Sequence, residues 1–286
     1  ITYKREIVLY FFLYITLMIS FFLGENSTGG AISDYIYQKE TSQKFGSKFL
    51  KTFYEYDAYG TRHSPLLIIL LSLFEKIKLP DILIRCIHLH LCLLLPIIFY
   101  KCLNVKFSKI DKKILLFLSS LIFLSPTFRS LAIWPDSRLL GLILFTLSIY
   151  YFLKFEENKN FKFVIFNTIT LALSAYISPN FSVFSIFFLT VYILNYGIFS
   201  KKIFSIVILN LILAFPAFYY LFVLDVNFLL KSAAIGIEES ERIIFNNLYN
   251  DVLITFSIIL FYLMPFIFFK IIRINNILNF KNISIS

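Results

Sequence analysis

The sequence predicts an all-α polytopic membrane protein with about eight transmembrane helices. Of its 286 residues, 59% are hydrophobic and only 15% are charged, whereas soluble domains have roughly 45–50% apolar and about 25% charged residues. The apolar residues form long runs separated by short basic clusters, which is typical of a chain that crosses a bilayer repeatedly. The three cysteines are widely spaced and form no Cys-x-x-Cys motif, which excludes a secreted disulfide scaffold and a zinc ribbon.

The transmembrane helices are predicted from run length, because a span needs about 20 apolar residues, with roughly 17 as the lower limit. The run Pro65–Phe74 has only ten residues before Glu75, so we expect an interfacial helix near residues 65–77 rather than a span. Eight other runs are predicted to cross the membrane: Ile7–Leu23, Ile82–Tyr100, Ile114–Leu124 with a continuation to Phe128, Arg138–Leu153, Phe161–Ile177, Phe181–Phe199, Ile203–Leu224 and Val252–Phe269.

The distribution of charge predicts the orientation of these spans. With eight spans both termini share one side, and the segments on that side hold fifteen of the 27 basic residues but only four of the 17 acidic ones. Cytoplasmic segments of membrane proteins carry an excess of Lys and Arg. Counting Pro65–Phe74 as a span would instead place the five lysines of Lys101–Lys113 outside. We therefore expect a bacterial inner membrane protein with both termini in the cytoplasm.

No Gly/Ser linker, internal repeat or low-complexity tract divides the chain, so residues 1–286 are predicted to form a single transmembrane domain. The first apolar run ends without a small-x-small cleavage site, which favours an uncleaved helix over a signal peptide. Because the chain begins at Ile1, we also expect a fragment, with C-terminal truncation as one form of it. The net charge of +10 is scattered between apolar runs, so a nucleic-acid partner is not expected.

The hydrophilic residues gather in the predicted outer loops rather than at mid-span. The first outer loop, residues 24–81, is nearly sixty residues long, and loops of this length in compact domains are usually functional. A second outer turn, Ser125–Ser137, comes directly before another span. The candidate site residues in these two segments and at the start of that span are Asp34, His63, Arg129, Asp136 and Arg138.

Motifs in these segments carry a family resemblance. Gly29–Tyr35 reads Gly-Gly-Ala-Ile-Ser-Asp-Tyr, Arg62–Leu67 reads Arg-His-Ser-Pro-Leu-Leu, and Ser-Pro at Ser125 is followed by Arg129 and then by Pro-Asp-Ser-Arg at Pro135–Arg138. Together they resemble the polytopic membrane glycosyltransferases of the C superfamily (GT-C), in the branch of protein O-mannosyltransferases and the lipid A aminoarabinose transferase. His-Ser-Pro-Leu stands here for the His-Pro-Pro-Leu of that branch, and the resemblance covers about the first 155 residues.

The resemblance implies an enzyme that moves a sugar from a polyprenyl-phosphate carrier to a lipid, glycan or protein acceptor on the extracytoplasmic side. Asp34 would be the catalytic base that takes the proton of the acceptor hydroxyl. The departing phosphate needs positive charge, either from side chains or from a divalent metal ion held by carboxylates. Asp136, Arg138, His63 and Arg129 are the residues we expect at this donor-phosphate or metal site. No cofactor is certain, and the acceptor and the sugar stay open.

Each candidate also has an interpretation that needs no chemistry. An aspartate in a loop is commonly just solvated, an aspartate before a helix can cap it, an arginine beside a bilayer can extend to the headgroups, and a histidine before Ser-Pro can shape a turn. These interpretations apply in turn to Asp34, Asp136, Arg138 and His63. His88 and His90 are two residues apart and therefore face different sides of a helix, so we expect packing rather than a metal site.

Two alternatives from other classes stay open. A transporter or lipid flippase usually places ionisable residues at mid-span and has broken helices at corresponding positions of two halves. The predicted spans are nearly free of charge, and the prolines Pro96, Pro216 and Pro265 do not repeat at a fixed offset. A non-catalytic membrane scaffold is the second alternative. The distance between Asp34 and Asp136 separates the readings, because only the transferase requires both beside one outer cavity.

Overall fold

The computed structural model describes residues 4–27, 29–59, 63–226, 252–254, 256–257 and 260. The chain divides into two units, Ile1–Leu229 and Leu230–Ser286. Nearly all the described residues belong to the first unit, and the fold and the candidate site below are those of that unit.

The described residues are helical, and no strand occurs among them. Short 3₁₀ turns cover Tyr56–Tyr59, Leu121–Leu124 and Pro179–Val183, and a π-helical turn covers Tyr219–Val223. The α-helices are α1 (Lys4–Leu23), α2 (Ala31–Ser47), α3 (Phe49–Tyr54), α4 (Pro65–Lys76), α5 (Asp81–Cys92), α6 (Leu94–Lys106), α7 (Lys112–Ser120), α8 (Pro126–Ile133), α9 (Ser137–Asn158), α10 (Phe161–Ile177), α11 (Phe184–Tyr196) and α12 (Lys201–Phe218).

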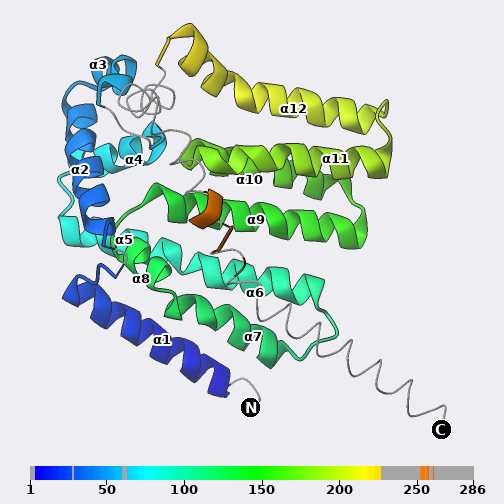
Figure 1. The fold of residues 1–286 in the computed structure, drawn as a ribbon, viewed down its shortest axis with the longest axis horizontal. Helices are drawn as coiled ribbons and strands as arrows, with labels where there is room; N and C mark the ends of the chain where they lie inside the picture. Colours follow the sequence, from blue (N-terminus) through cyan, green and yellow to red (C-terminus); the bar gives the residue numbers. More distant parts are fainter. Residues whose placement is uncertain are drawn as a thin grey trace. The chain divides into compact units, whose positions relative to one another are not determined.

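The long helices lie side by side in a layered stack, with α9 between α6 and α10 (Figure 1). Helices α2, α3 and α4 gather at one end of the stack, together with α8 and the start of α9. The connections α6–α7, α9–α10 and α11–α12 lie at the opposite end. We call the first the loop end and the second the basic end, because the lysines of Lys101–Lys113, Lys154–Lys162 and Lys201–Lys202 lie in or beside these connections.

Within the described residues, four helices are long and apolar enough to cross a membrane: Asp81–Lys106, Ser137–Asn158, Pro179–Tyr196 and Lys201–Val223. A fifth candidate is the pair Lys112–Leu124 and Pro126–Ile133, whose two parts meet at 65°. Val8–Leu23 and Phe161–Ile177 are apolar helices of fewer than 18 residues. The predicted all-helical membrane character is thus confirmed, while the count of eight spans is not. The predicted span Val252–Phe269 lies mostly outside the described residues.

Prolines account for the breaks in two of these spans. Pro96 lacks the backbone N–H that would bond to Cys92, and the junction of α5 and α6 lies at Leu93 beside that lost bond. Ser125 ends the preceding 3₁₀ turn and caps α8, since its side chain accepts from the Phe128 amide and Pro126 occupies the first helical position. The bend at Ser125 directs α8 along the loop end.

The first outer loop folds into helices that pack on one another. Helix α2 buries one face, which includes Tyr35, Gln38 and Phe45, and it packs against α4. Helix α4 begins at Pro65 with Ser64 as its N-cap, and its 12 residues span about 18 Å at a rise of ~1.5 Å per residue. That length is well short of a hydrocarbon core of about 30 Å. The helix predicted near residues 65–77 is therefore present and too short to cross.

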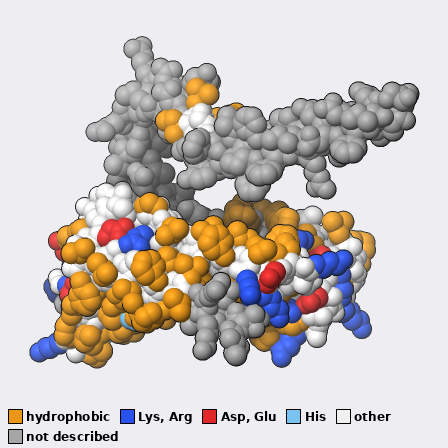
Figure 2. All heavy atoms as spheres, turned by 90° about the horizontal axis from the view of Figure 1, so that it is seen from below, with side chains coloured by type: hydrophobic (Ala, Val, Ile, Leu, Met, Phe, Trp, Pro, Cys, Tyr) orange, Lys and Arg blue, Asp and Glu red, His pale blue; other side chains and the backbone are white. Residues whose placement is uncertain are grey.

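Apolar side chains cover much of the outer surface of the unit. Figure 2 shows one such face, with Lys and Arg gathered at its basic end. On α12 the side chains of Phe204, Leu211 and Phe215 are each more than 60% exposed and share one side of the helix. On α1 Phe11 and Phe22 are exposed to a similar degree. Apolar surface of this extent on the outermost helices fits contact with lipid rather than with water.

Candidate functional site

The start of α9 is built around Asp136. This residue precedes the helix, and its Oδ1 accepts a hydrogen bond from the Arg138 amide at 2.7 Å, which makes it the N-cap. The same carboxylate receives the Arg138 Nε at 3.0 and 3.2 Å and the Nη2 at 2.7 Å. Its side chain is only 2% exposed, so the ion pair and the cap hold a buried charge in place. Asp136 is therefore both a helix cap and the fixed partner of Arg138.

Asp34 reaches the same guanidinium from the first turn of α2. Its Oδ2 lies 2.7 Å from Arg138 Nη2, the nitrogen that also donates to Asp136. Sharing one nitrogen limits the distance between the two carboxylate oxygens to about 5.4 Å. The structure thus brings together two acids that are a hundred residues apart in sequence. Both Asp34 and Arg138 are partly exposed, at 38% and 51%, so this side of the cluster is accessible.

His63 joins this group through Ser137. Its Nδ1 lies 3.1 Å from the Ser137 hydroxyl, and Ser137 stands between Asp136 and Arg138 in the chain. The backbone of His63 is held as well, because its carbonyl accepts the Tyr56 hydroxyl at 2.9 Å. The structure therefore gathers Asp34, His63, Asp136 and Arg138 at the loop end, and we call these four residues the acid–arginine cluster. Arg62, in the same predicted motif, lies outside the described residues.

Arg129 belongs to a different group. Its guanidinium pairs with Glu25 at 2.9 Å and hydrogen bonds to Ser20 and Thr16, so it ties α8 to the end of α1. Its position near the start of α8 directs the side chain toward α1 rather than toward α9. The expectation that Arg129 would serve the donor phosphate is therefore replaced by a structural role. Burial opposes ionisation of Glu25, but the hydrogen bonds from Arg129, Ser20 and Ser27 outweigh it and lower the pKa of this carboxyl.

A second layer of contacts, which the sequence did not indicate, supports the start of α2. The hydroxyl of Tyr35 and the Nζ of Lys39 both lie 2.6 Å from Asp81 Oδ1, which joins α2 to the beginning of α5. Burial, together with the negative charge of Asp81, raises the pKa of the Tyr35 phenol. The ring of Trp134 packs between Tyr35 and Arg85, with the Arg85 guanidinium 3.6 Å from the indole centre. Since Tyr35 follows Asp34 in the chain, this layer fixes where Asp34 emerges.

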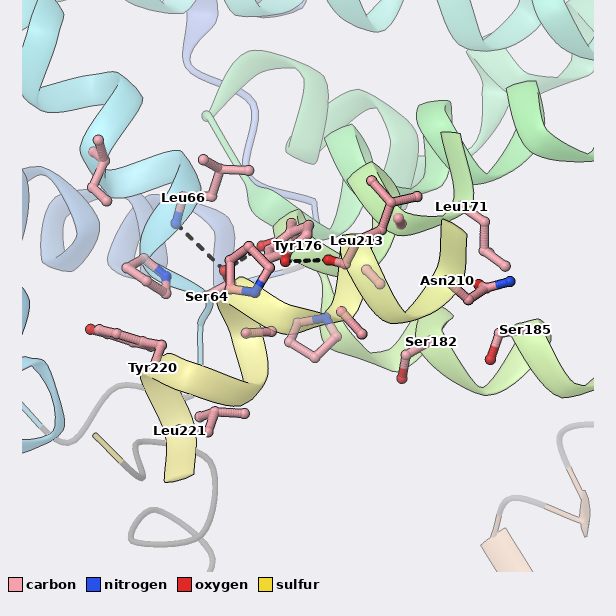
Figure 3. A pocket seen from close by; sticks show the side chains of 18 of the residues that line it. Ser64, Leu66, Leu171, Tyr176, Ser182, Ser185, Asn210, Leu213, Tyr220 and Leu221 are labelled. Atoms are coloured by element: carbon pink, nitrogen blue, oxygen red, sulfur yellow. Dashed lines mark hydrogen bonds between the residues drawn. The ribbon is translucent and has the colours of Figure 1, made fainter. Parts of the chain in front are cut away.

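An apolar cavity of about 520 Å³ lies beside the cluster, between α4, α10, α11 and α12 (Figure 3). Ser64, which lines the cavity, directly follows His63, and its hydroxyl donates to the Tyr176 carbonyl. The cavity and the acid–arginine cluster are thus adjacent in the chain as well as at the same end of the stack. Most of the other lining residues are apolar and come from the ends of α10 and α12, among them Leu171, Ala175, Leu213, Ala214 and Ala217.

No group of three or more His, Cys, Asp or Glu side chains suited to a metal ion occurs among the described residues. His88 and His90 do point in different directions, as their spacing predicts. His88 is buried with its Nε2 2.9 Å from the Leu131 carbonyl, whereas His90 is exposed and bonds to Tyr14 at 3.1 Å. Two carboxylates remain available to a divalent ion, those of Asp34 and Asp136. Magnesium is commonly held by one or two carboxylates together with substrate phosphate and water.

Comparison of the chain with protein-family models, with curated proteins and with solved structures finds no match.

Proposed function

We propose that this chain is a membrane glycosyltransferase that moves a sugar from a polyprenyl-phosphate carrier to an acceptor on the extracytoplasmic side, as the GT-C resemblance implies. The observation that carries the proposal is the convergence of Asp34 and Asp136 on Arg138, directly beside an apolar cavity. A lipid-linked sugar has the same two parts, a charged phosphate at the membrane surface and a hydrocarbon tail. Soluble sugar donors would have no use for a cavity of this lining.

The placement of the site supports the same proposal. We infer eight spans with both termini in the cytoplasm of a bacterial inner membrane, which puts the basic end inside and the loop end outside. The acid–arginine cluster then lies at the outer surface, at the depth of a lipid phosphate. The spans themselves contribute no ion pair at mid-depth within the described residues, whereas transporters place ionisable groups there. The glycosyltransferase therefore accounts for the position of the charges better than a transporter does.

In the proposed reaction Arg138 receives the donor phosphate. Guanidinium groups bind phosphate through two parallel hydrogen bonds, and the Arg138 Nη1 donates to no described residue. Asp136, fixed by the helix cap, keeps the guanidinium aimed at the surface. A divalent ion held by Asp34 and Asp136 would add positive charge for the phosphate. His63, beside Ser137, lies where it can donate a hydrogen bond to the leaving group.

Asp34 then acts as the general base. The acceptor oxygen attacks the anomeric carbon, its proton passes to the Asp34 carboxylate, and the bond from that carbon to the phosphate oxygen breaks with its electron pair remaining on the phosphate. For this Asp34 must leave Arg138, and its 38% exposure and its position in the first turn of α2 allow it to do so. The products are the glycosylated acceptor and the polyprenyl phosphate.

The test is transfer of labelled sugar in membranes that contain the wild-type chain, the Asp34→Asn variant or a matched control. Membranes are incubated with isotopically labelled polyprenyl-phosphate sugars, and label is followed into every product, water included as acceptor. We expect Asp34→Asn to lower transfer by about 10²–10⁴-fold, the usual contribution of a general base. Glu40→Gln, an exposed acid on the same helix, is the control and should leave transfer unchanged.

Donor binding separates the role of Asp34 from a general loss of structure. Because Asp34→Asn removes a negative charge from beside Arg138, the variant should bind polyprenyl phosphate at least as tightly as the wild type. Transfer that is unchanged in Asp34→Asn would remove Asp34 from the mechanism. Absence of transfer from every polyprenyl-phosphate sugar by the wild type would contradict the proposed function itself.

A further inference from the structure

The size of the apolar cavity is set by small residues on two facing helices. Ala172 and Ala175 line it from α10, and Ala214 and Ala217 line it from α12. On each helix the two alanines are three residues apart and therefore lie on one face. Any larger side chain at these positions would occupy space that is now open. The cavity is thus a consequence of four specific positions rather than of loose packing.

The volume of the cavity corresponds to a limited length of hydrocarbon. A protein cavity of about 150 Å³ accommodates benzene, which gives roughly 25 Å³ for each carbon atom. By this measure a cavity of about 520 Å³ holds on the order of 20 carbon atoms, or about four isoprene units. Polyprenyl carriers are generally longer than this, so most of such a tail would have to lie outside.

The two ends of the cavity differ in character. At one end lie Ser64, next to the acid–arginine cluster, and Tyr220, whose hydroxyl donates to the Phe53 carbonyl at 2.8 Å. At the other end Figure 3 shows Asn210 close to Ser185. A hydrocarbon chain gains nothing by pressing against these polar groups. A tail that enters from the Ser64 end therefore fills the apolar part and then turns out into the surrounding lipid.

Features of α12 keep the wall at the Ser64 end in place. Pro216 interrupts the helix, and the π-helical turn Tyr219–Val223 follows it. The Tyr176 hydroxyl bonds to the Leu213 carbonyl at 2.5 Å, which joins α10 to α12 just before the proline. The ring of Tyr220 packs 4.6 Å from that of Phe53. The wall is therefore preformed, and a ligand tail packs against it without first having to order it.

We propose that the cavity recognises only the part of the carrier tail next to the phosphate, about four isoprene units, and that longer carriers gain no further affinity. This inference rests on the proposed function. Within a membrane the tail is already surrounded by hydrocarbon, so its gain in the cavity comes from close packing that fluid lipid does not supply. The gain must therefore stop where the cavity stops.

The experiment measures binding of unmodified polyprenyl phosphates of graded length to the full chain in lipid nanodiscs. Apparent affinity should rise by on the order of tenfold from one unit to about four units and change less than twofold beyond that. In Ala175→Phe, which fills part of the cavity, the plateau should move to shorter chains while the affinity for the one-unit phosphate is kept. Leu173→Phe, on the exposed side of the same helix, is the matched control and should leave the plateau in place.

The outcomes separate the inference from the proposed function. Affinity that keeps rising through eight units, or a plateau that Ala175→Phe does not move in a folded protein, overturns the inference even where sugar transfer is observed. A plateau at about four units without sugar transfer to any acceptor supports the inference and contradicts the proposed function. If no polyprenyl phosphate binds at any length, both are wrong.

Discussion

Replacing Asp136 separates its role as a helix cap from its role as the partner of Arg138. Asparagine caps helices about as well as aspartate but carries no charge, whereas alanine does neither. Loss of the cap costs about 1 kcal/mol. Loss of the ion pair adds little, because Arg138 is half exposed and solvent screens the interaction. We therefore expect Asp136→Asn to be close to the wild type in stability and Asp136→Ala to be less stable by about 1 kcal/mol.

Thermal unfolding in detergent and sugar transfer are the two measurements. A loss of 1 kcal/mol lowers the melting temperature by roughly 2–4 °C for a chain of this size. Transfer should fall in both variants, by on the order of tenfold or more, since neither fixes the Arg138 guanidinium. The control is Asp111, which caps α7 at the basic end through a 2.9 Å bond from the Lys113 amide. There alanine should cost stability but leave transfer unchanged.

Two results would refute this reasoning. If Asp136→Asn melts as early as Asp136→Ala, the cap does not account for the stability. If Asp136→Asn transfers sugar at the wild-type rate, the carboxylate does not orient Arg138, and its buried pairing is only structural.

Two further predictions concern the support of the site. The pKa of Glu25 is lowered in the folded state, so its stabilising effect is present above its ordinary value of 4.5 and is lost as the pH falls through the lower folded value; the melting temperatures of wild type and Glu25→Gln should therefore converge as the pH is lowered below about 4.5. Gly141→Ala should destabilise the protein by about 1–3 kcal/mol, because the added Cβ would lie 2.7 Å from that of Ser178 where α9 meets α10. An unchanged melting temperature would show that this contact relaxes easily, and Gly46→Ala, with open space around it, is the control.

The arrangement of the helices was largely predictable because run length and charge are local properties of the sequence. The run that became α9 was predicted to begin at Arg138, one residue from its observed start at Ser137. The run around Pro65 was predicted not to cross, and the structure gives it 12 residues. The bend at Ser125 was not predicted, since a Ser-Pro pair within an apolar run reads equally well as a turn outside the membrane.

The composition of the site was only partly predictable. The motifs indicated that Asp34 and Asp136 belong together, but no sequence property fixes the direction of a side chain on a short helix. A residue added to or removed from α8 turns Arg129 by about 100°, which decides whether it faces α1 or α9. Glu25, its partner, was not singled out because a lone glutamate after a helix is common. The cavity could not be predicted at all, since it depends on alanines of two helices that are forty residues apart.

The charges of the cluster also constrain the order of events. Asp34, Asp136 and Arg138 together carry one net negative charge at neutral pH, so a phosphate cannot join them without a rearrangement. Asp136 is buried and bonded to the helix end, whereas Asp34 is held by a single contact to Nη2 and is far more exposed. Asp34 is therefore the group that gives way. The donor phosphate, by taking Arg138, would release the same carboxylate that the transfer needs as its base, so that a base is available only when a donor is present.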